Sequence, residues 1–262
     1  EGPIKGKGFS SGTSMVFGFN EDTAPLLKEK GFDVLSIANN HAIDQKWDGR
    51  DSTIKLLDAQ ELGWCGHPTE AAEDSVLYQE QNGLKYAFVC FNDAVYDTDD
   101  NSMAELIKTV RPKVDLLIVS IHWGSEYKHS PSQKYQIDLG HAFIEAGADF
   151  IIGHHPHVVQ TFEVYNGKFI FYSLGNFIFD QYWSNDTQEG LAIGINMKFE
   201  NDAIGEDVLK TDVQLFPMRS EKSQARLMTD EEKSKWVEKF IGYYQYSDTM
   251  KSQIRNFEVS SY

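Results

Sequence analysis

The stretch Asp115-Leu-Leu-Ile-Val-Ser-Ile-His122, followed at once by Trp123 and Gly124, decides the fold class of this chain. A nearly continuous apolar run of this length is typical of a strand that is covered on both faces of a sheet. The run ends in a histidine, so a side chain with metal-binding and proton-transfer chemistry follows a buried strand.

Two further segments repeat this arrangement of an apolar run followed by a polar cluster. Asp33–Ala38 precedes Asn39-Asn-His41, and Asp149–Ile152 precedes Gly153-His-His-Pro-His157. Helical patterns separate these runs, at residues 21–30, 49–62, 102–110 and 133–146. Alternating strands and helices predict an α/β fold. Ligands in open α/β folds bind beyond the carboxyl ends of the strands, so we expect the three polar clusters to meet.

The character of the sequence changes after about residue 160. Strand-like runs occupy 162–165, 168–172, 191–199 and 208–216, and an amphipathic helical pattern covers 230–244. We expect a second, more antiparallel sheet here, closed by that helix. An earlier strand pair is predicted around Asn82-Gly83, which is a hairpin signal, and residues 1–20 are expected to form a loop. We treat residues 1–262 as a single domain, since α/β folds of this length often form one unit.

Composition narrows the function classes. Lys and Arg total 24 and Asp and Glu total 40, which gives a net charge of −16 and disfavours nucleic-acid binding. No run of 18 apolar residues and no signal-peptide pattern is present, so we expect neither a membrane span nor a secretory signal in this chain. We expect Cys65 and Cys90 to be buried thiols or inert bystanders rather than a disulfide.

Imidazole together with amide or carboxylate oxygen suits borderline metals such as Zn, Mn, Fe and Ni. Neither cysteine lies in the polar clusters, which favours a catalytic over a structural metal site. Pro156 restricts the backbone between His155 and His157, which would help both rings to reach one metal pair. Other histidines are expected to be structural or surface residues, namely His67, His129 and His141. Three aromatic residues beside strand ends are expected to bury area by packing rather than to bind cofactors, namely Trp123, Phe177 and Phe179.

Four motifs in this order carry a family resemblance: Ala38-Asn-Asn-His-Ala-Ile-Asp44, His122-Trp-Gly-Ser-Glu-Tyr127, Gly153-His-His-Pro-His-Val-Val-Gln160 and Tyr172-Ser-Leu-Gly-Asn-Phe177. They resemble the motifs of the poly-γ-glutamate capsule biosynthesis family of the capsule protein A type, over residues 1 to about 180. That family is similar to calcineurin-like metallophosphatases. The resemblance implies a four-layer α/β/β/α sandwich, with a two-metal centre on the loops at one sheet edge.

The resemblance also implies roles for individual residues. His41 would act as an acid or touch the substrate, and His154 would stay outside the metal shell. The implied metal ligands are Asn40, His122, His155 and His157. The family begins with a strand ending in Gly-Asp, which this chain lacks, so we expect a centre short of one aspartate, with Glu1 as a candidate ligand.

Further roles follow from the residues around these ligands. Asp44 either orients His41 or caps a turn, and both interpretations stay open. Glu126 and Tyr127 are expected to line the mouth of the site and bind substrate. The expected cofactors are two divalent metal ions, among Mn, Zn, Fe and Mg.

Three function classes remain open at this point. The first is a metal-dependent hydrolase acting on a phosphoester. The second is an enzyme or accessory factor of poly-γ-glutamate synthesis or export, whose scissile bond, if it cleaves one, is a γ-glutamyl amide. The third is a non-catalytic polymer-binding or export accessory factor with a vestigial metal site. The resemblance implies an anionic polymer or phosphoester as substrate, the capsule synthesis machinery as partner, and the extracellular face of the cell envelope as location.

Overall fold

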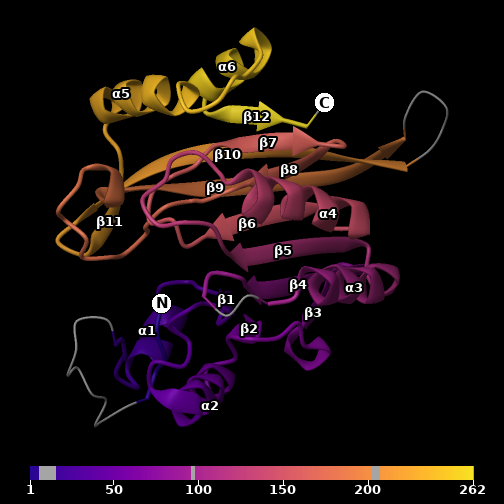
Figure 1. The fold of residues 1–262 in the computed structure, drawn as a ribbon, viewed down its shortest axis with the longest axis vertical. Coiled ribbons are helices and arrows are strands. Elements are labelled where there is room, and N and C mark those ends of the chain that lie inside the picture. The colour runs from indigo at the N-terminus through magenta and orange to yellow at the C-terminus, as the bar shows by residue number, and fades with distance from the viewer. Residues whose placement is uncertain (6–15, 96–97, 202–206, 262) are drawn as a thin grey trace. The chain divides into compact units, whose positions relative to one another are not determined.

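The computed structural model of the 262-residue chain describes residues 1–5, 16–95, 98–201 and 207–261. They form two compact units, each described below by itself (Figure 1). Unit 1 comprises Glu1–Trp123 and Glu145–Ala148, and unit 2 comprises Gly124–Ile144 and Asp149–Tyr262. Helices and strands alternate and build several sheets, which confirms the α/β prediction, whereas the four-layer arrangement and the single domain stay predictions. Much of the loop expected at residues 1–20, namely 6–15, lies outside the described residues.

Unit 1 opens with a small parallel sheet and two helices. The elements are α1 (Thr23–Glu29), β1 (Val34–Ser36), α2 (Lys46–Asp58) and β2 (Gly63–Cys65). The two strands pair in parallel, so the segments that follow them leave the same edge of the sheet. Their core is a cluster of buried aliphatic side chains: Ile4, Ala24, Ile37, Leu57 and Leu62. The three-residue strand β2 was not predicted, because its sequence Gly-Trp-Cys lacks an apolar run.

The larger sheet of unit 1 follows. It contains β3 (Leu77–Gln81), β4 (Leu84–Asn92) and β5 (Leu116–His122), with α3 (Asp100–Val110) between the last two. The predicted hairpin joins β3 and β4, and β4 pairs with β5 in parallel. Because the register places Asn92 opposite His122, the polar carboxyl ends of both strands lie side by side. Short 3-10 turns occupy Glu73–Ser75 and Arg111–Lys113.

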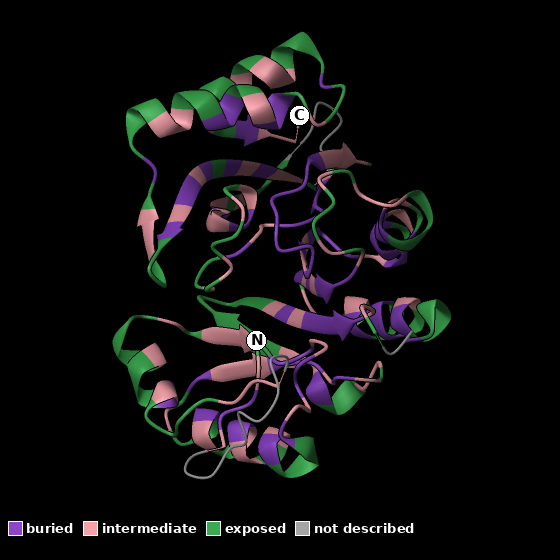
Figure 2. Ribbon diagram, turned by 60° about the vertical axis from the view of Figure 1, so that its left-hand side comes forward, coloured by how far each residue is buried: buried purple, intermediate pink, exposed green. Residues whose placement is uncertain are grey.

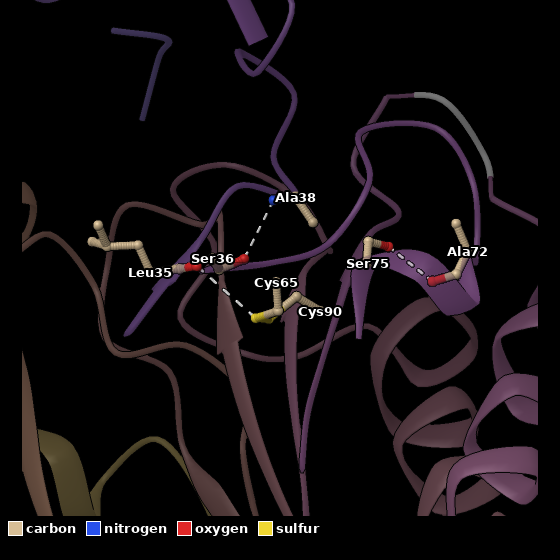
Figure 3. The surroundings of a disulfide bond; sticks show 7 residues. All are labelled: Leu35, Ser36, Ala38, Cys65, Ala72, Ser75 and Cys90. Carbon is tan, nitrogen blue, oxygen red and sulfur yellow. Dashed lines mark hydrogen bonds between the residues drawn. A yellow bond between two sulfur atoms is a disulfide. The ribbon is translucent and has the colours of Figure 1, made fainter. Parts of the chain in front are cut away.

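A disulfide joins β2 to β4 within unit 1 (Figure 3). Cys65 and Cys90 lie 5.4 Å apart between Cα atoms, and both are nearly inaccessible to solvent. The expectation of two thiols was therefore wrong. The apolar residues around each cysteine indicate burial, but the sequence cannot show that two cysteines 25 residues apart face each other on neighbouring strands.

In unit 2, a mixed set of strands contains β6 (Phe150–His154), β7 (Phe162–Tyr165) and β8 (Lys168–Phe171). β6 and β8 are parallel, and β7 and β8 are antiparallel. The predicted helix begins as a π-helical turn, Gln133–Asp138, and continues as α4 (Leu139–Ala146), which belongs to unit 2 up to Ile144. We had assigned the strands after residue 160 to a separate antiparallel sheet, and for β7 and β8 this was wrong, because β8 pairs with β6.

The predicted antiparallel sheet begins later, with β9 (Glu189–Asn201) and β10 (Asp207–Glu221). β10 also pairs with β11 (Gln224–Leu227) and β12 (Glu258–Ser260). The helices α5 (Asp230–Ile241) and α6 (Asp248–Arg255) lie along β12 in Figure 1, and α5 turns a buried face inward in Figure 2. The helix predicted at 230–244 is confirmed as α5. Among the described residues, no helix is both long and apolar enough to cross a membrane.

Candidate metal centre

The strand ends of unit 1 gather five of the predicted site residues. Asn40, His41 and Asp44 lie on the turn between β1 and α2, and His122 is the last residue of β5. The carboxylate of Glu1 faces both histidines, at 3.7 Å from His122 Nε2 and 4.0 Å from His41 Nε2. The cluster is largely shielded from water, since His41 is 8% and His122 4% exposed.

His41 is held by a carboxylate on its far side. Its Nδ1 lies 2.8 Å from Asp44 Oδ2, which also accepts a hydrogen bond of 2.7 Å from the backbone N–H of Phe17. The Phe17 ring meets the imidazole edge-on, with centroids 4.4 Å apart. A carboxylate accepts but cannot donate, so neutral His41 carries its proton on Nδ1 and presents the lone pair of Nε2 toward Glu1.

His122 and Asn40 form the second pair in unit 1. The Nε2 atom of His122 and the Oδ1 atom of Asn40 are 2.8 Å apart. Imidazole nitrogen and amide oxygen are both ordinary donors to borderline divalent metals. With the Glu1 carboxylate, unit 1 thus brings together three possible metal ligands: an imidazole nitrogen, an amide oxygen and a carboxylate oxygen.

Unit 2 carries His155 and His157 on the segment after β6. Both are buried, and both have backbone φ in the left-handed region, at +97° for His155 and +59° for His157. Non-glycine residues held in sparsely populated backbone regions cost about 1–3 kcal/mol each, and such outliers cluster at functional sites. The two rings lie 6.1 Å apart between centroids.

An asparagine that we did not predict as a site residue fixes the tautomer of His157. Asn176 Nδ2 donates to the carbonyl oxygen of Thr187 at 2.9 Å, so Asn176 Oδ1 is left to accept. That oxygen lies 2.9 Å from His157 Nδ1, which must therefore carry the proton. The Nε2 lone pair of His157 is thereby available for a metal, in the arrangement that orients most metal-binding histidines.

Tyr127, one of the two residues expected at the mouth of the site, packs beside His157 in unit 2. Its ring stacks on the imidazole with centroids 5.9 Å apart, and its backbone N–H donates to the carbonyl oxygen of Pro156 at 2.8 Å. Tyr127 and the neighbouring Trp183 are 39% and 64% exposed, which makes them accessible to a substrate. Glu126, the other expected residue, is partly exposed.

The three aromatic residues that were expected to pack differ in how far they are buried. Trp123 is fully buried, which confirms the prediction for that residue. Phe177 is 46% exposed, so the prediction was wrong there, because it lies on a loop that the strand pattern does not continue into. Phe179 is partly buried and packs against His157, with centroids 5.0 Å apart.

His129 and His141, expected to be structural or surface residues, have structural partners. His129 lies 3.2 Å from the carbonyl oxygen of Val159 and 3.1 Å from Asp186. His141 lies 2.6 Å from Glu163 and stacks on Tyr165 with centroids 3.7 Å apart. Both rings therefore have packing and hydrogen bonding that explain their presence.

The donor chemistry of these side chains fits divalent metal ions. In the described part of the chain, no three His, Cys, Asp or Glu side chains have the spacing for one shared ion. Each unit nevertheless holds possible metal-donor atoms: His122 Nε2 lies beside Asn40 Oδ1 in unit 1, and Asn176 orients His157 in unit 2. The convergence of His122 with His155 and His157 stays a prediction.

The fold and these residues define a class of protein: an α/β protein whose strand ends carry histidines held by hydrogen bonds. The model of the family described as "Bacterial capsule synthesis protein PGA_cap" matches residues 1–181, and the chain belongs to this family. The chain is 36% identical over 212 residues to a protein of Bacillus anthracis named capsule biosynthesis protein CapA, covering 74% of this chain and 51% of that protein.

Two further relatives have similar coverage. The PGA biosynthesis protein CapA of Bacillus subtilis is 36% identical over 187 residues, covering 66% of this chain and 49% of that protein. A probable polyglutamine synthesis accessory protein of Mycobacterium tuberculosis is 27% identical over 199 residues, covering 66% of this chain and 52% of that protein. The chain thus spans about half the length of the curated relatives it matches.

Solved structures give distant likenesses. A hypothetical protein from Thermus thermophilus aligns with a TM-score of 0.45 and 16% identity, over 78% of this chain and 77% of that one. A putative 5'-nucleotidase from Staphylococcus aureus aligns with a TM-score of 0.48 and 13% identity, over 84% of this chain and 44% of that one.

Proposed function

We propose that this chain is a metal-dependent hydrolase-like part of a capsule synthesis protein. Its substrate would be an anionic polymer with γ-glutamyl amide bonds, or a phosphoester. The observation that carries the proposal is the His41–Asp44 pair beside Asn40 and His122, since it places an oriented imidazole next to metal-donor atoms. Family membership supports the capsule context.

The proposed ligands are Asn40, His122 and Glu1 in unit 1 and His155 and His157 in unit 2. Two divalent ions held by such donors would acidify a bound water and polarise the bond under attack. The metal could be Mn, Zn, Fe or Mg, all of which accept nitrogen and oxygen donors.

The chain's own residues supply orientation and proton transfer. When His41 is protonated, its Nε2–H would donate a proton to the leaving group, while Asp44 holds Nδ1 and stabilises the imidazolium. The backbone N–H of Phe17 donates to the Asp44 carboxylate, which helps to hold Asp44 in position against His41. Tyr127 and Glu126 would contact the substrate, with the exposed Tyr127 ring offering a stacking surface.

Two substrates test the proposal. The chain, loaded with Mn or Zn and desalted, is incubated with a chromogenic phosphodiester and with γ-linked polyglutamate. Hydrolysis of either, abolished by chelation and restored by metal, is the expected result. Failure of both substrates with a metal-loaded protein contradicts the hydrolase proposal.

A second candidate is a non-catalytic accessory factor that binds polymer. The relative from Mycobacterium tuberculosis that is named a probable polyglutamine synthesis accessory protein supports this alternative. Retained binding of γ-linked polyglutamate, measured by calorimetry on a protein that hydrolyses nothing, is the result that would favour it.

We also propose that the chain works on the extracellular face of the cell envelope, in contact with the capsule synthesis machinery. The Cys65–Cys90 disulfide supports this location, because disulfides persist mainly in oxidising compartments. Alkylation of the native protein in intact cells, followed by mass spectrometry, tests it. Cysteines that are found reduced and alkylated in cells would contradict an extracellular location.

A further inference from the structure

Unit 1 contains a group of three side chains, Trp47, Arg50 and His67, that the proposed metal chemistry does not use. Trp47 and Arg50 lie in the first turns of α2, directly after the turn that carries His41. His67 follows β2 at the same edge of the parallel β1–β2 sheet, which places the group near the strand-end loops of unit 1.

The three side chains contact one another through the Trp47 ring. The imidazole of His67 stacks on it with centroids 5.5 Å apart and planes inclined by 27°. The guanidinium carbon of Arg50 lies 6.0 Å from the centre of the same ring. Trp47 itself is 47% exposed, so one side of the group is open to solvent.

Arg50 is a largely buried cation, and one of its N–H groups has no hydrogen-bond acceptor among the described residues. Its side chain is only 15% exposed, and its Nε–H is fully buried with no acceptor among the described residues. Among the described residues its guanidinium forms an ion pair with Asp51, 3.5 Å from Nη1, but that carboxylate is 59% exposed and therefore strongly screened. Burying a guanidinium without acceptors is costly, and native proteins seldom leave such donors unpaired.

His67 adds a second donor beside this cation. Its Nδ1 lies 3.4 Å from the backbone N of Thr69, which donates to it, so the ring proton is on Nε2. Burial, and next the Arg50 guanidinium, lower the pKa of His67, whereas the carboxylates of Glu70 and Asp74 act in the opposite direction. The ring is thus neutral near pH 7 and still offers one N–H.

The loop that carries His67 is fixed by its surroundings. Gly66 has φ +103°, and a Cβ at this position would stand 2.5 Å from the Ala38 Cβ, so only glycine allows this approach to the loop after β1. The carbonyl oxygen of Pro68 accepts a buried hydrogen bond of 2.7 Å from Asn92 Nδ2 at the end of β4. A donor set that is held in place in advance binds a ligand at lower entropic cost.

We propose that Arg50, His67 and Trp47 form a binding site for an oxyanion, either a carboxylate or a phosphate group. A planar guanidinium matches both groups with two parallel hydrogen bonds, and the His67 Nε2–H adds a further donor. In a chain of net charge −16, a dedicated cationic site of this kind gives an anionic ligand a favourable contact. The site does not depend on hydrolysis at the metal centre.

The test follows the His67 ring resonances by NMR during titration with inorganic phosphate and, separately, with γ-linked triglutamate. The protein is stripped of metal and desalted first, so that binding to metal does not contribute. Because a bound anion favours the imidazolium, the pKa of His67 should rise with saturation. Saturation by phosphate alone, by triglutamate alone or by both supports the site and assigns its ligand.

The variants localise the binding to this group. Arg50→Gln should weaken it by about tenfold or more, because the charge-assisted pair is lost. Arg50→Lys, which keeps the charge but not the paired geometry, should lie between Arg50→Gln and the wild type. Lys55→Gln removes the same charge from an exposed position on the same helix and should bind like the wild type. Equal affinities of Arg50→Gln and Lys55→Gln, or no response of His67 to either ligand, would overturn the proposal.

Discussion

At the residue scale, the histidines at the strand ends differ in what orients them. His41 has a carboxylate partner, Asp44, and His157 has an amide partner, Asn176, and each leaves its Nε2 lone pair available in the neutral ring. The sequence predicted His41 and Asp44 as candidates because they lie on one motif, three residues apart. It did not predict the role of Asn176, because that role depends on a hydrogen bond to Thr187 that only the folded loop creates.

The division of roles between His41 and the metal ligands gives a first prediction. His41→Ala should leave metal content unchanged and lower hydrolysis by roughly 10² to 10⁴-fold, the usual effect of removing a general acid. Metal analysis and rate measurements on the same preparation check this. If His41→Ala loses metal as fully as His157→Ala does, His41 is a ligand; if it loses neither metal nor activity, it is a structural residue of the turn.

A second prediction concerns Asn176. Asn176→Ala should lower metal affinity by about 10- to 100-fold, because His157 loses the acceptor that fixes its tautomer. Gln181→Ala is the matched control, since Gln181 accepts from Asn176 Nδ2 but makes no hydrogen bond to His157. Competition with a metal-sensitive dye measures both affinities, and equal values for the two variants would refute the orienting role.

At the element scale, periodicity predicted the long elements and some short ones, such as β1 and β7, but missed several other short ones. The runs around β4, β5 and β6 and the helices α2, α3 and α5 were predicted because they contain enough residues to show a period. β2, β11, β12 and α6 were not, since three- to eight-residue elements are stabilised mainly by their neighbours. The same limit explains why the pairing of Cys65 with Cys90 was not foreseen.

The disulfide supports a third prediction, on stability. Replacing both Cys65 and Cys90 with serine should lower the free energy of unfolding by roughly 2–4 kcal/mol, the typical contribution of such a cross-link. Urea denaturation with and without reductant measures it. Reductant should destabilise the wild type and leave the double variant unchanged; a wild type insensitive to complete reduction would contradict the prediction.

A fourth prediction uses the N-terminus of α5, where Thr229 and Glu232 form a capping box. The Arg226 guanidinium, and then the Thr229 backbone N–H, lower the pKa of Glu232 to about 2 from its usual 4.5. A lowered folded-state pKa contributes stability above the unfolded pKa, and this stability is lost as pH falls through the folded pKa.

Glu232→Gln should therefore be less stable than the wild type above pH 4.5, and the difference should shrink between pH 4.5 and 2. Denaturation curves recorded across this range test it. Glu231→Gln, at a neighbouring exposed position, is the control and should show a smaller difference. A difference in stability between Glu232→Gln and the wild type that stays constant down to pH 2 would contradict the predicted pH dependence.

At the scale of the whole molecule, charge and fold class were predictable from composition and alternation, and the family from four ordered motifs. The chain carries −16 overall, so anionic ligands require local cations, which bound metal and Arg50 would supply. The sequence did not indicate Arg50, because a single arginine in a helical pattern reads as a surface residue. Only its burial and its unpaired Nε–H single it out.

The central claim is that this chain binds divalent metal through its strand-end histidines. The most direct measurement is the metal content of the protein after loading with Mn or Zn and desalting, compared among wild type, His122→Ala, His157→Ala and the control His141→Ala. We expect bound metal in the wild type and in His141→Ala, because the His141 ring contacts Glu163 rather than the proposed ligands, and a clear loss in the other two. A wild type that retains no metal, or variants at His122 and His157 that retain as much as the control, would contradict the account.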